Sequence, residues 1–156
     1  MRAVVQRVKN ASVQVNGEQV SSINAGLLCL IGLRAGDTKK DADFICKKIL
    51  KTRVWPNKET GKQWDTDVTD GDGREILMVS QFTLYGRTKK SKPDFSHAMP
   101  PQEAREFYQA FVENVRQEYI AEKVKDGVFG AMMDVSLTND GPVTFVIDSE
   151  VDEPKA

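Results

Sequence analysis

The stretch ASVQVNGEQVSSINAGLLCLIGL, residues 11–33, decides the fold. SVQV at 12–15 alternates polar and apolar residues, as a half-buried strand does, and EQVSSI at 18–23 is its predicted return strand. Asn16-Gly17 between them is a strong hairpin signal, because a type I′ turn needs positive φ at both central residues. After a second turn at Ala25-Gly26, LLCLIGL at 27–33 is apolar on both faces. The stretch therefore predicts a hairpin followed by a buried central strand.

The residues on either side extend this pattern. AVVQRV at 3–8 is rich in β-branched residues and predicts a further strand, and EILMVSQFTL at 75–84 predicts another. Residues 38–53 predict a helix whose start Asp37 or Thr38 can cap. Its apolar positions recur at i, i+3, i+4, i+7 and i+8: Ala42, Ile45, Cys46, Ile49 and Leu50. The polar segment at 57–74 is predicted to be an exposed loop.

The second half adds one helix and two strands. A long loop at 86–101 leads into a helix with Pro101 in its first turn. The apolar stripe predicted to face the sheet is Ala104, Phe107, Tyr108, Phe111, Val112 and Val115. AMMDVSLTN at 131–139 and PVTFVID at 142–148 predict the last strands, after KDGVFG at 125–130. We expect an α+β domain over residues 1–150, with a frayed acidic tail at 151–156. We expect the mainly antiparallel sheet of this domain to curl into a barrel-like core, with two long helices packed outside it.

Composition excludes several classes of protein. The 156 residues carry 22 basic and 23 acidic side chains, so any contact with nucleic acid must come from a local basic patch. One His and two Cys cannot supply a four-ligand zinc site, and the four aspartates at 65, 67, 70 and 72 match a calcium loop poorly. We therefore expect no metal and no cofactor. The chain has no apolar segment of membrane-spanning length and no signal-peptide pattern, so we expect a cytoplasmic protein whose Cys29 and Cys46 are buried, reduced thiols.

The sequence lacks the usual catalytic motifs. It contains no phosphate-binding glycine loop, no HExxH and no GxSxG. His97 is the single imidazole, and its place in a proline-rich loop favours a solvated side chain. Without it, a general base at neutral pH would have to be a carboxylate or lysine with a shifted pKa. An enzyme of this composition must act on a labile bond or borrow catalytic groups from its substrate.

Two polar segments at strand ends are candidate sites. Ser80-Gln81-Phe82-Thr83-Leu84 ends an apolar strand, and a cationic loop with Arg87, Lys89, Lys90 and Lys92 follows it, an order that suits a substrate with a phosphate backbone. The second segment, residues 138–144, contains Gly141-Pro142 between two predicted strands. Proline cannot donate to a strand ladder, so this is no ordinary hairpin. Since only about 5–6% of X-Pro bonds are cis, composition alone favours a trans turn.

These residues resemble the D-aminoacyl-tRNA deacylases, also called D-tyrosyl-tRNA deacylases. The resemblance runs from MRAVVQRV and ASVQVNGE through SQFTL at 80–84 to FGAMM at 129–133 and NDGPVT at 139–144. KPDFSHAMP at 92–100 is more similar to eukaryotic than to bacterial members. The resemblance implies a homodimer with a barrel-like fold and active sites at the subunit interface. It implies hydrolysis of the ester between a D-amino acid, or glycine, and the 3′ end of tRNA.

The resemblance also assigns residues. Ser80, Gln81, Phe82 and Thr83 would form the catalytic pocket, and Phe129 and Met133 would hold the terminal adenine. Gly141-Pro142 would be cis and reach into the neighbouring subunit's pocket, with Arg7 bracing it. Thr144 completes the predicted substrate-binding set. The charge of the loop after Leu84, rather than the resemblance, predicts that Arg87, Lys89, Lys90 and Lys92 contact the tRNA backbone.

An aminoacyl ester is labile, which fits a site without a conventional base. We expect backbone N–H groups near Phe82 and Thr83 to stabilise the oxyanion, and the ribose 2′-OH to assist proton transfer. The hydroxyls of Thr83 and Thr144 are the alternatives. Backbone carbonyls at Gly141-Pro142 would reject L side chains by collision, which gives chiral proofreading. The alternative function is a non-catalytic RNA-binding module that uses Tyr85 and the basic loop.

Overall fold

The computed structural model, which describes residues 1–71 and 73–154, is organised around one long strand, β1 (Arg2–Val15). One edge of β1 pairs with β6 (Asp134–Asp148). The other edge pairs first with β3 (Gly26–Gly32) and then with β2 (Glu18–Ile23), and all three pairings are antiparallel. The hairpin prediction is confirmed, since Asn16 and Gly17 both have positive φ.

The two strands predicted at 3–8 and 12–15 are one strand, so the division between them was wrong. The polar pair Lys9-Asn10, between the two predicted strands, is an exposed irregularity in the ladder with β6. The predicted strands 131–139 and 142–148 likewise belong to the single strand β6, which starts only at Asp134. Backbone pairing to β1 continues on both sides of the proline, which local propensity does not reveal.

The other half of the sheet is parallel. β4 (Glu75–Ser80) pairs in parallel with β3, and β5 (Val124–Asp126) pairs in parallel with β4. The sheet is therefore mixed, and less antiparallel than the hairpin signals predicted. β5 overlaps the segment at 125–130, for which the sequence predicts no strand, because three residues are too few to show a strand period.

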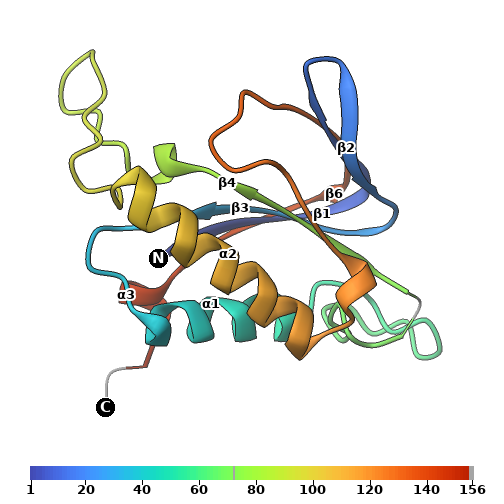
Figure 1. Cartoon of the computed structure of the whole chain (residues 1–156). Helices are drawn as coiled ribbons and strands as arrows, with labels where there is room; N and C mark the ends of the chain where they lie inside the picture. The colour runs from blue at the N-terminus through green and yellow to red at the C-terminus, as the bar shows by residue number, and fades with distance from the viewer. Residues whose placement is uncertain (72, 155–156) are drawn as a thin grey trace.

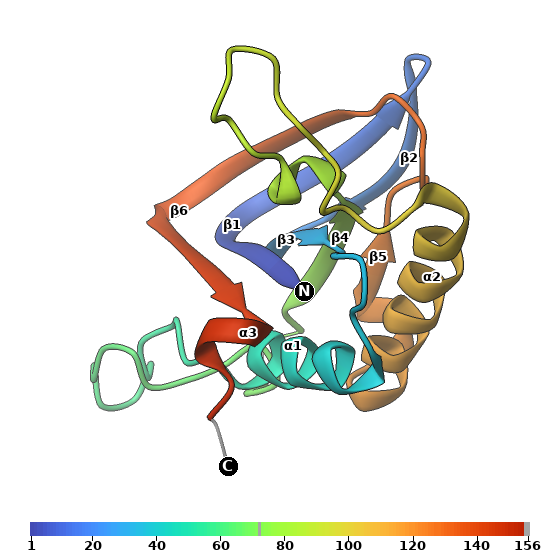
Figure 2. The ribbon, with the colours of Figure 1, turned by 90° about the vertical axis from the view of Figure 1, so that its left-hand side faces the viewer.

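The sheet curls almost into a barrel, as predicted. Its strand order is β2-β1-β3-β4-β5, so β2 and β5 are the two ends of this path. The Ser21 hydroxyl of β2 donates to the Asp126 carbonyl of β5 at 2.8 Å, which ties the two ends together. Figure 2 shows the curl, with β6 running alongside β1.

The apolar run in β3 serves two cores. Successive side chains of a strand face opposite sides. Leu27, Cys29 and Ile31 face the helices and belong to the larger core, whereas Leu28 packs inside the curled sheet with Val13. Neighbouring β4 divides in the same way, so both strands are apolar on both faces because both faces are buried.

Two long helices cover the outer face of the curled sheet (Figure 1). α1 (Lys39–Lys51) and α2 (Pro101–Glu118) match the predictions, with Thr38 at the N-cap of α1 and Pro101 at the start of α2. Their predicted stripes are buried, except that Phe107 is partly exposed. Cys29 and Cys46 are buried free thiols, as expected, and burial raises the pKa of Cys46 to about 11.

Three short helical segments were not predicted. η1 (Phe82–Tyr85) replaces the end of the strand predicted over 75–84, which stops at Ser80. η2 (Ala121–Lys123) precedes β5, and α3 (Ser149–Asp152) follows β6. The tail predicted to fray from residue 151 therefore begins inside α3, whose start is capped by the Asp148 carboxylate. Residues 155–156 lie outside the described residues.

The predicted loop at 57–74 is polar and irregular over its described residues. Its aspartates serve local turns, since Asp67 accepts from Thr69 and Asp70 accepts from the Asp67 N–H. Asp72 lies outside the described residues, and within residues 1–71 and 73–154 no group of three or more His, Cys, Asp or Glu is placed to hold a metal ion. Within the same described residues, none of the helices has the length and apolar character needed to span a membrane.

Candidate active site

The candidate site has two separate parts, which we call half-sites. The first half-site, Ser80, Gln81, Phe82 and Thr83, lies where the parallel strands end. β3, β4 and β5 run in the same direction, so the segments after Gly32, Ser80 and Asp126 leave the sheet at one edge. At this edge the Gln81 N–H donates to the Ile31 carbonyl at 2.7 Å, and η1 begins. Gly32 is required here because a Cβ would lie 2.7 Å from the Cβ of Leu84.

η1 presents polar groups and an exposed aromatic ring. The Gln81 amide donates to the Thr83 hydroxyl, and Thr83 itself is exposed. Phe82 is 59% exposed and meets Phe95 edge-on, with ring centroids 5.0 Å apart. The N–H groups of Phe82 and Thr83 open a 3₁₀ turn, so they have no partner within it. This half-site therefore offers backbone donors beside a polar side chain and an apolar platform.

Arg2 holds η1 in place, and sequence reasoning missed it. Its Nη1 donates to the Leu84 carbonyl at 2.9 Å, and its Nε bonds Asp148 at 2.7 Å. The guanidinium also lies over the Tyr85 ring, 4.5 Å from the centroid. Nothing in the spacing of the first residues indicates this role, because the partners lie more than 80 positions away.

The segment 127–133, which carries Phe129 and Met133, leaves β5 at the same edge of the sheet as η1 leaves β4. Phe129 is held by two residues of α2, since its ring lies 5.7 Å from the Tyr108 ring and the Arg105 guanidinium lies 5.0 Å above it. Met133 packs over Gly127, where a Cβ would be 2.7 Å from the Met133 sulfur. The sequence placed Tyr108 in the core stripe but gave no sign that it and Arg105 hold Phe129.

A partly buried hydrogen bond anchors the start of this segment. The Tyr108 hydroxyl donates to the Asp126 carboxylate, one residue before Gly127. Burial raises the pKa of Asp126, while the bond from Tyr108 opposes that rise. Desolvation and the nearby Asp126 charge both raise the pKa of Tyr108, so its hydroxyl keeps its proton. The pair fixes the direction in which the chain leaves β5.

Tyr108→Phe is expected to lower the free energy of unfolding by about 1–3 kcal/mol at pH 8, because it leaves an ionised carboxylate short of a buried donor. The substitution raises the Asp126 pKa further. A raised folded-state pKa contributes stability below the unfolded aspartate value of about 3.9, and that contribution is lost as the pH rises through the folded value. Denaturant melts should therefore show a smaller loss at pH 4.

Tyr119→Phe is the matched control, since the Tyr119 hydroxyl bonds the Val68 and Arg74 carbonyls, which do not titrate. The free energy of unfolding that Tyr119→Phe loses should be the same at pH 4 and pH 8. A pH-independent loss in Tyr108→Phe would contradict the role given to Asp126.

The second half-site is the turn at Gly141-Pro142, which projects from β6. Gln6 pairs with Thr144 and Val8 with Asn139, so residues 140–143 loop out opposite Arg7. The Gly141-Pro142 bond is cis, the isomer that the resemblance implies and composition alone did not favour. Gly141 has φ +124°, a conformation in which an L side chain is strained, and both residues of the turn are exposed.

Arg7 braces this turn, as the resemblance implies. Its Nε donates to the Asp140 carbonyl at 3.1 Å and lies 3.4 Å from the Asp140 carboxylate. Its Nη1 donates to the Val54 carbonyl, after the end of α1. The Arg7 side chain is only 15% exposed, so it joins the turn to the body of the protein with little competition from water.

The two half-sites do not meet within one chain. Arg7 pairs with Leu27 at the start of β3, whereas Ser80 pairs with Ile31 near its end. Four residues of strand separate these positions by about 13 Å. The structure brings Ser80, Gln81, Phe82 and Thr83 to the same edge as the segment with Phe129 and Met133, and it places Arg7, Gly141, Pro142 and Thr144 at the opposite end of the sheet.

The basic loop lies beyond η1. Arg87 pairs with Asp94 at 2.9 Å, which leaves Lys89, Lys90 and Lys92 as the exposed cations between them. Hydrogen bonds from Ser96 and Arg87 lower the pKa of Asp94, so the pair stays charged. The backbone carbonyl of His97 accepts a hydrogen bond from the Ala35 N–H.

Comparisons with known proteins identify the family. A family model described as D-Tyr-tRNA(Tyr) deacylase matches residues 4–148. D-aminoacyl-tRNA deacylase of Dictyostelium discoideum is 51% identical over 96% of this chain and 99% of its own length, and D-aminoacyl-tRNA deacylase 1 of Homo sapiens is 49% identical over 96% and 70%.

Two solved structures share the fold. One, described as c-Myc DNA Unwinding Element Binding Protein, is 48% identical, with a TM-score of 0.91 over 96% of this chain and 99% of that chain. The other, described as a probable eukaryotic D-amino acid tRNA deacylase, is 17% identical and shows the fold alone, with a TM-score of 0.79 over 94% and 98%. Because the family model matches residues 4–148, which is almost the whole chain, the chain belongs to the D-Tyr-tRNA deacylase family.

Proposed function

We propose that this protein hydrolyses the ester that joins a D-amino acid, or glycine, to the 3′-terminal adenosine of tRNA. The observation that carries the proposal is the family match over residues 4–148, which includes both half-sites. Incubation with D-Tyr-tRNA and L-Tyr-tRNA tests it, with loss of the ester followed over time. We expect release of D-tyrosine and tRNA, and an L-ester that decays only at its rate in buffer. An equal rate for both would contradict chiral proofreading.

In the proposed reaction, water attacks the ester carbonyl and the bond to the ribose 3′ oxygen breaks. The Phe82 and Thr83 N–H groups are well placed to stabilise the oxyanion that forms on the carbonyl oxygen. The neighbouring ribose 2′-OH relays a proton from the water to the leaving 3′ oxygen. An aminoacyl ester is activated, so positioning and oxyanion stabilisation are enough without a side-chain nucleophile. The products are the amino acid and tRNA with a free 3′-OH.

Thr83→Ala and Thr144→Ala are each expected to lower the deacylation rate less than about 10²-fold, because in this mechanism neither hydroxyl forms a bond to substrate carbon. Single-turnover hydrolysis of D-Tyr-tRNA measures the chemical step. Thr138→Ala is the control for Thr144, since Thr138 lies on the same strand in the pairing opposite Asn10. A loss of about 10⁴-fold or more in either variant would identify a side-chain catalyst and overturn the substrate-assisted mechanism.

The active site is proposed to need two copies of the chain. The separation of the half-sites supports this, since an exposed Gly141-Pro142 turn can enter a pocket that its own chain does not complete. Apolar groups are exposed near both ends: Phe145 and Trp64 beside the turn, and Val146 in a depression of about 480 Å³ that Leu84 also lines. Sedimentation equilibrium should give twice the chain mass, and a monomer that is fully active would contradict the proposal.

Chirality follows from the turn. Backbone carbonyls presented by Gly141-Pro142 would collide with an L side chain, whereas a D side chain would point away and glycine would pass. Because the pocket does not grip the side chain, several D-amino acids should react at similar rates. The exposed Lys89, Lys90 and Lys92 are proposed to contact the phosphates of the incoming tRNA.

A non-catalytic nucleic-acid-binding role is the second candidate. One observation favours it, namely the solved relative described as a DNA unwinding element binding protein, at 48% identity. This role predicts salt-dependent binding of nucleic acid without ester loss. The comparison of D-Tyr-tRNA with L-Tyr-tRNA therefore separates the two functions.

A further inference from the structure

The exposed face of α1 is strongly basic. Its thirteen residues, KKDADFICKKILK, carry five lysines and two aspartates, in a chain whose formal net charge is −1. The neighbouring helix α2 carries two arginines and four glutamates. Both helices pack on the same face of the sheet (Figure 1), so covering the core does not require the lysines of α1.

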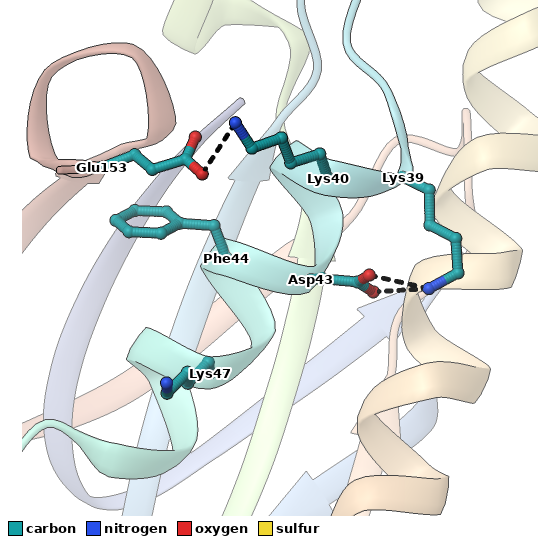
Figure 3. Close-up of a pocket in the computed structure, with 6 residues that line it drawn as sticks. All are labelled: Lys39, Lys40, Asp43, Phe44, Lys47 and Glu153. Carbon is teal, nitrogen blue, oxygen red and sulfur yellow. Dashed lines mark hydrogen bonds and ion pairs between the residues drawn. The ribbon is translucent and has the colours of Figure 1, made fainter. Parts of the chain in front are cut away.

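The lysines form a row opposite the buried stripe. At about 100° per residue, Lys40, Lys47 and Lys51 fall within about 40° of one another around the helix, and the row is about 16 Å long. The side chain of Lys40 is 79% exposed, and Lys47 and Lys51 are also exposed. Figure 3 shows the first two projecting from the outer side of α1, with Phe44 between them. They line a shallow depression of about 410 Å³ together with Phe44, the Lys39–Asp43 ion pair and Glu153.

Nearby acids neutralise this row weakly. Lys40 pairs at 3.3 Å with Glu153, which is partly exposed, and Lys51 bonds the Thr69 hydroxyl at 3.2 Å in an exposed contact, so a polyanion can compete for both lysines. Asp41 does not face the row, because it accepts from Thr38 and from Ser149. Positive potential therefore remains along the outer side of the helix.

The chain connects α1 to both half-sites. It begins seven residues after Gly32, at the edge where η1 lies, and it leads at its far end to Val54, whose carbonyl holds Arg7. In Figure 2 the loop that carries Lys89 and Lys90 rises on one side of η1, and α1 lies on the other. A tRNA whose 3′ end entered the site would thus meet cations on two sides.

We infer that Lys40, Lys47 and Lys51 bind the phosphate backbone of the tRNA whose 3′ end occupies the active site. The inference rests on the proposed function and adds a contact surface to it. Each lysine that neutralises a phosphate releases counterions, so each adds about 0.7–0.9 to the slope of log affinity against log salt.

The test variant is Lys40→Gln/Lys47→Gln/Lys51→Gln. Its KM for D-Tyr-tRNA in low salt should rise at least about tenfold with kcat unchanged, and the salt slope should fall by about 2–3. With 3′-O-D-tyrosyl adenosine, which has no tRNA body, KM and kcat should equal those of the wild type. An unchanged KM and salt slope with D-Tyr-tRNA would overturn the inference.

The control variant, Lys9→Gln/Lys123→Gln/Lys125→Gln, removes the same charge from β1, η2 and β5. It should leave KM and the salt slope near the wild-type values, and an equal loss there would show a general charge effect and overturn the inference. If the wild type hydrolyses neither substrate, the proposed function fails. Fluorescence anisotropy with uncharged tRNA then decides the lysine row alone, because the α1 variant must bind more weakly than the control variant.

Discussion

Arg7→Ala is expected to lower the rate of D-Tyr-tRNA hydrolysis about 10²- to 10³-fold. The guanidinium bridges the Asp140 and Val54 carbonyls, and each charge-assisted bond of this kind contributes about 1.5–3 kcal/mol. Without the bridge the Gly141-Pro142 turn loses its link to the body of the protein. Misplacement of a positioning group by about 1 Å can cost about 10²-fold in rate.

Single-turnover rates measure this loss, and circular dichroism at the assay temperature shows whether the variant is folded. Arg7→Lys keeps the charge but cannot reach both carbonyls with a planar fork, so its loss should be intermediate. Arg116→Ala is the control, since Arg116 bonds Glu113 and the Val124 carbonyl away from the turn. A folded Arg7→Ala protein within tenfold of the wild-type rate would contradict the bracing role.

The Arg7 variant also tests whether the site is shared between subunits. Arg7→Ala damages the turn, and Gln81→Ala/Phe82→Ala damages the pocket at the other end of the sheet. If the two half-sites meet across an interface, each mixed dimer has one intact site, and an equal mixture should regain roughly a quarter of wild-type activity after subunit exchange. If both halves of the site belong to one chain, mixing will restore nothing.

Gly141→Ala is expected to lower D-Tyr-tRNA hydrolysis about 10²-fold or more and to weaken rejection of L-Tyr-tRNA. At φ +124° an L side chain is strained, and the new Cβ would lie 3.0 Å from Val143 Cγ2 and 3.3 Å from the Arg7 guanidinium. The turn must move to relieve these contacts. Its carbonyls would then leave the positions from which they exclude an L side chain.

Gly17→Ala separates this effect from the backbone strain itself. Gly17 also has positive φ, at +80°, but a Cβ there meets nothing within 4 Å and the turn between β1 and β2 lies outside both half-sites. It should lose about 1 kcal/mol of stability and keep its activity and its D/L ratio. Rates on both charged tRNAs give the ratio, and an unchanged ratio in a slowed Gly141→Ala enzyme would remove the turn from chiral selection.

The fold was largely predictable where a local pattern specifies it. Asn16-Gly17, the stripe from Ala42 to Leu50 and the doubly apolar LLCLIGL each led to the right element, because turn chemistry and periodicity act over short distances. The parallel pairing of β5 and the 3₁₀ turn at Phe82–Tyr85 did not follow from any pattern. Both depend on contacts with residues far away in the sequence.

The candidate site, like the fold, could be predicted only in part. Its two motifs and Arg7 were found through resemblance to a family, whereas residues alone gave only a polar strand end and an unusual Gly-Pro bond. Arg2, Arg105 and Tyr108 were missed as positioning residues, since each looks like an ordinary strand or helix residue until its partner is known. The sequence could not predict that the two motifs lie at opposite ends of the sheet, because this depends on the register of β1 against β3.

Arg2 and Arg7, which brace the two half-sites, belong to the same strand, β1, and this couples the working geometry to global stability. β1 is hydrogen-bonded along both edges, so it cannot detach without opening the whole sheet. Opening of β1 would therefore release the pocket edge and the Gly-Pro turn together, and we expect unfolding of the sheet to abolish activity at both half-sites at once.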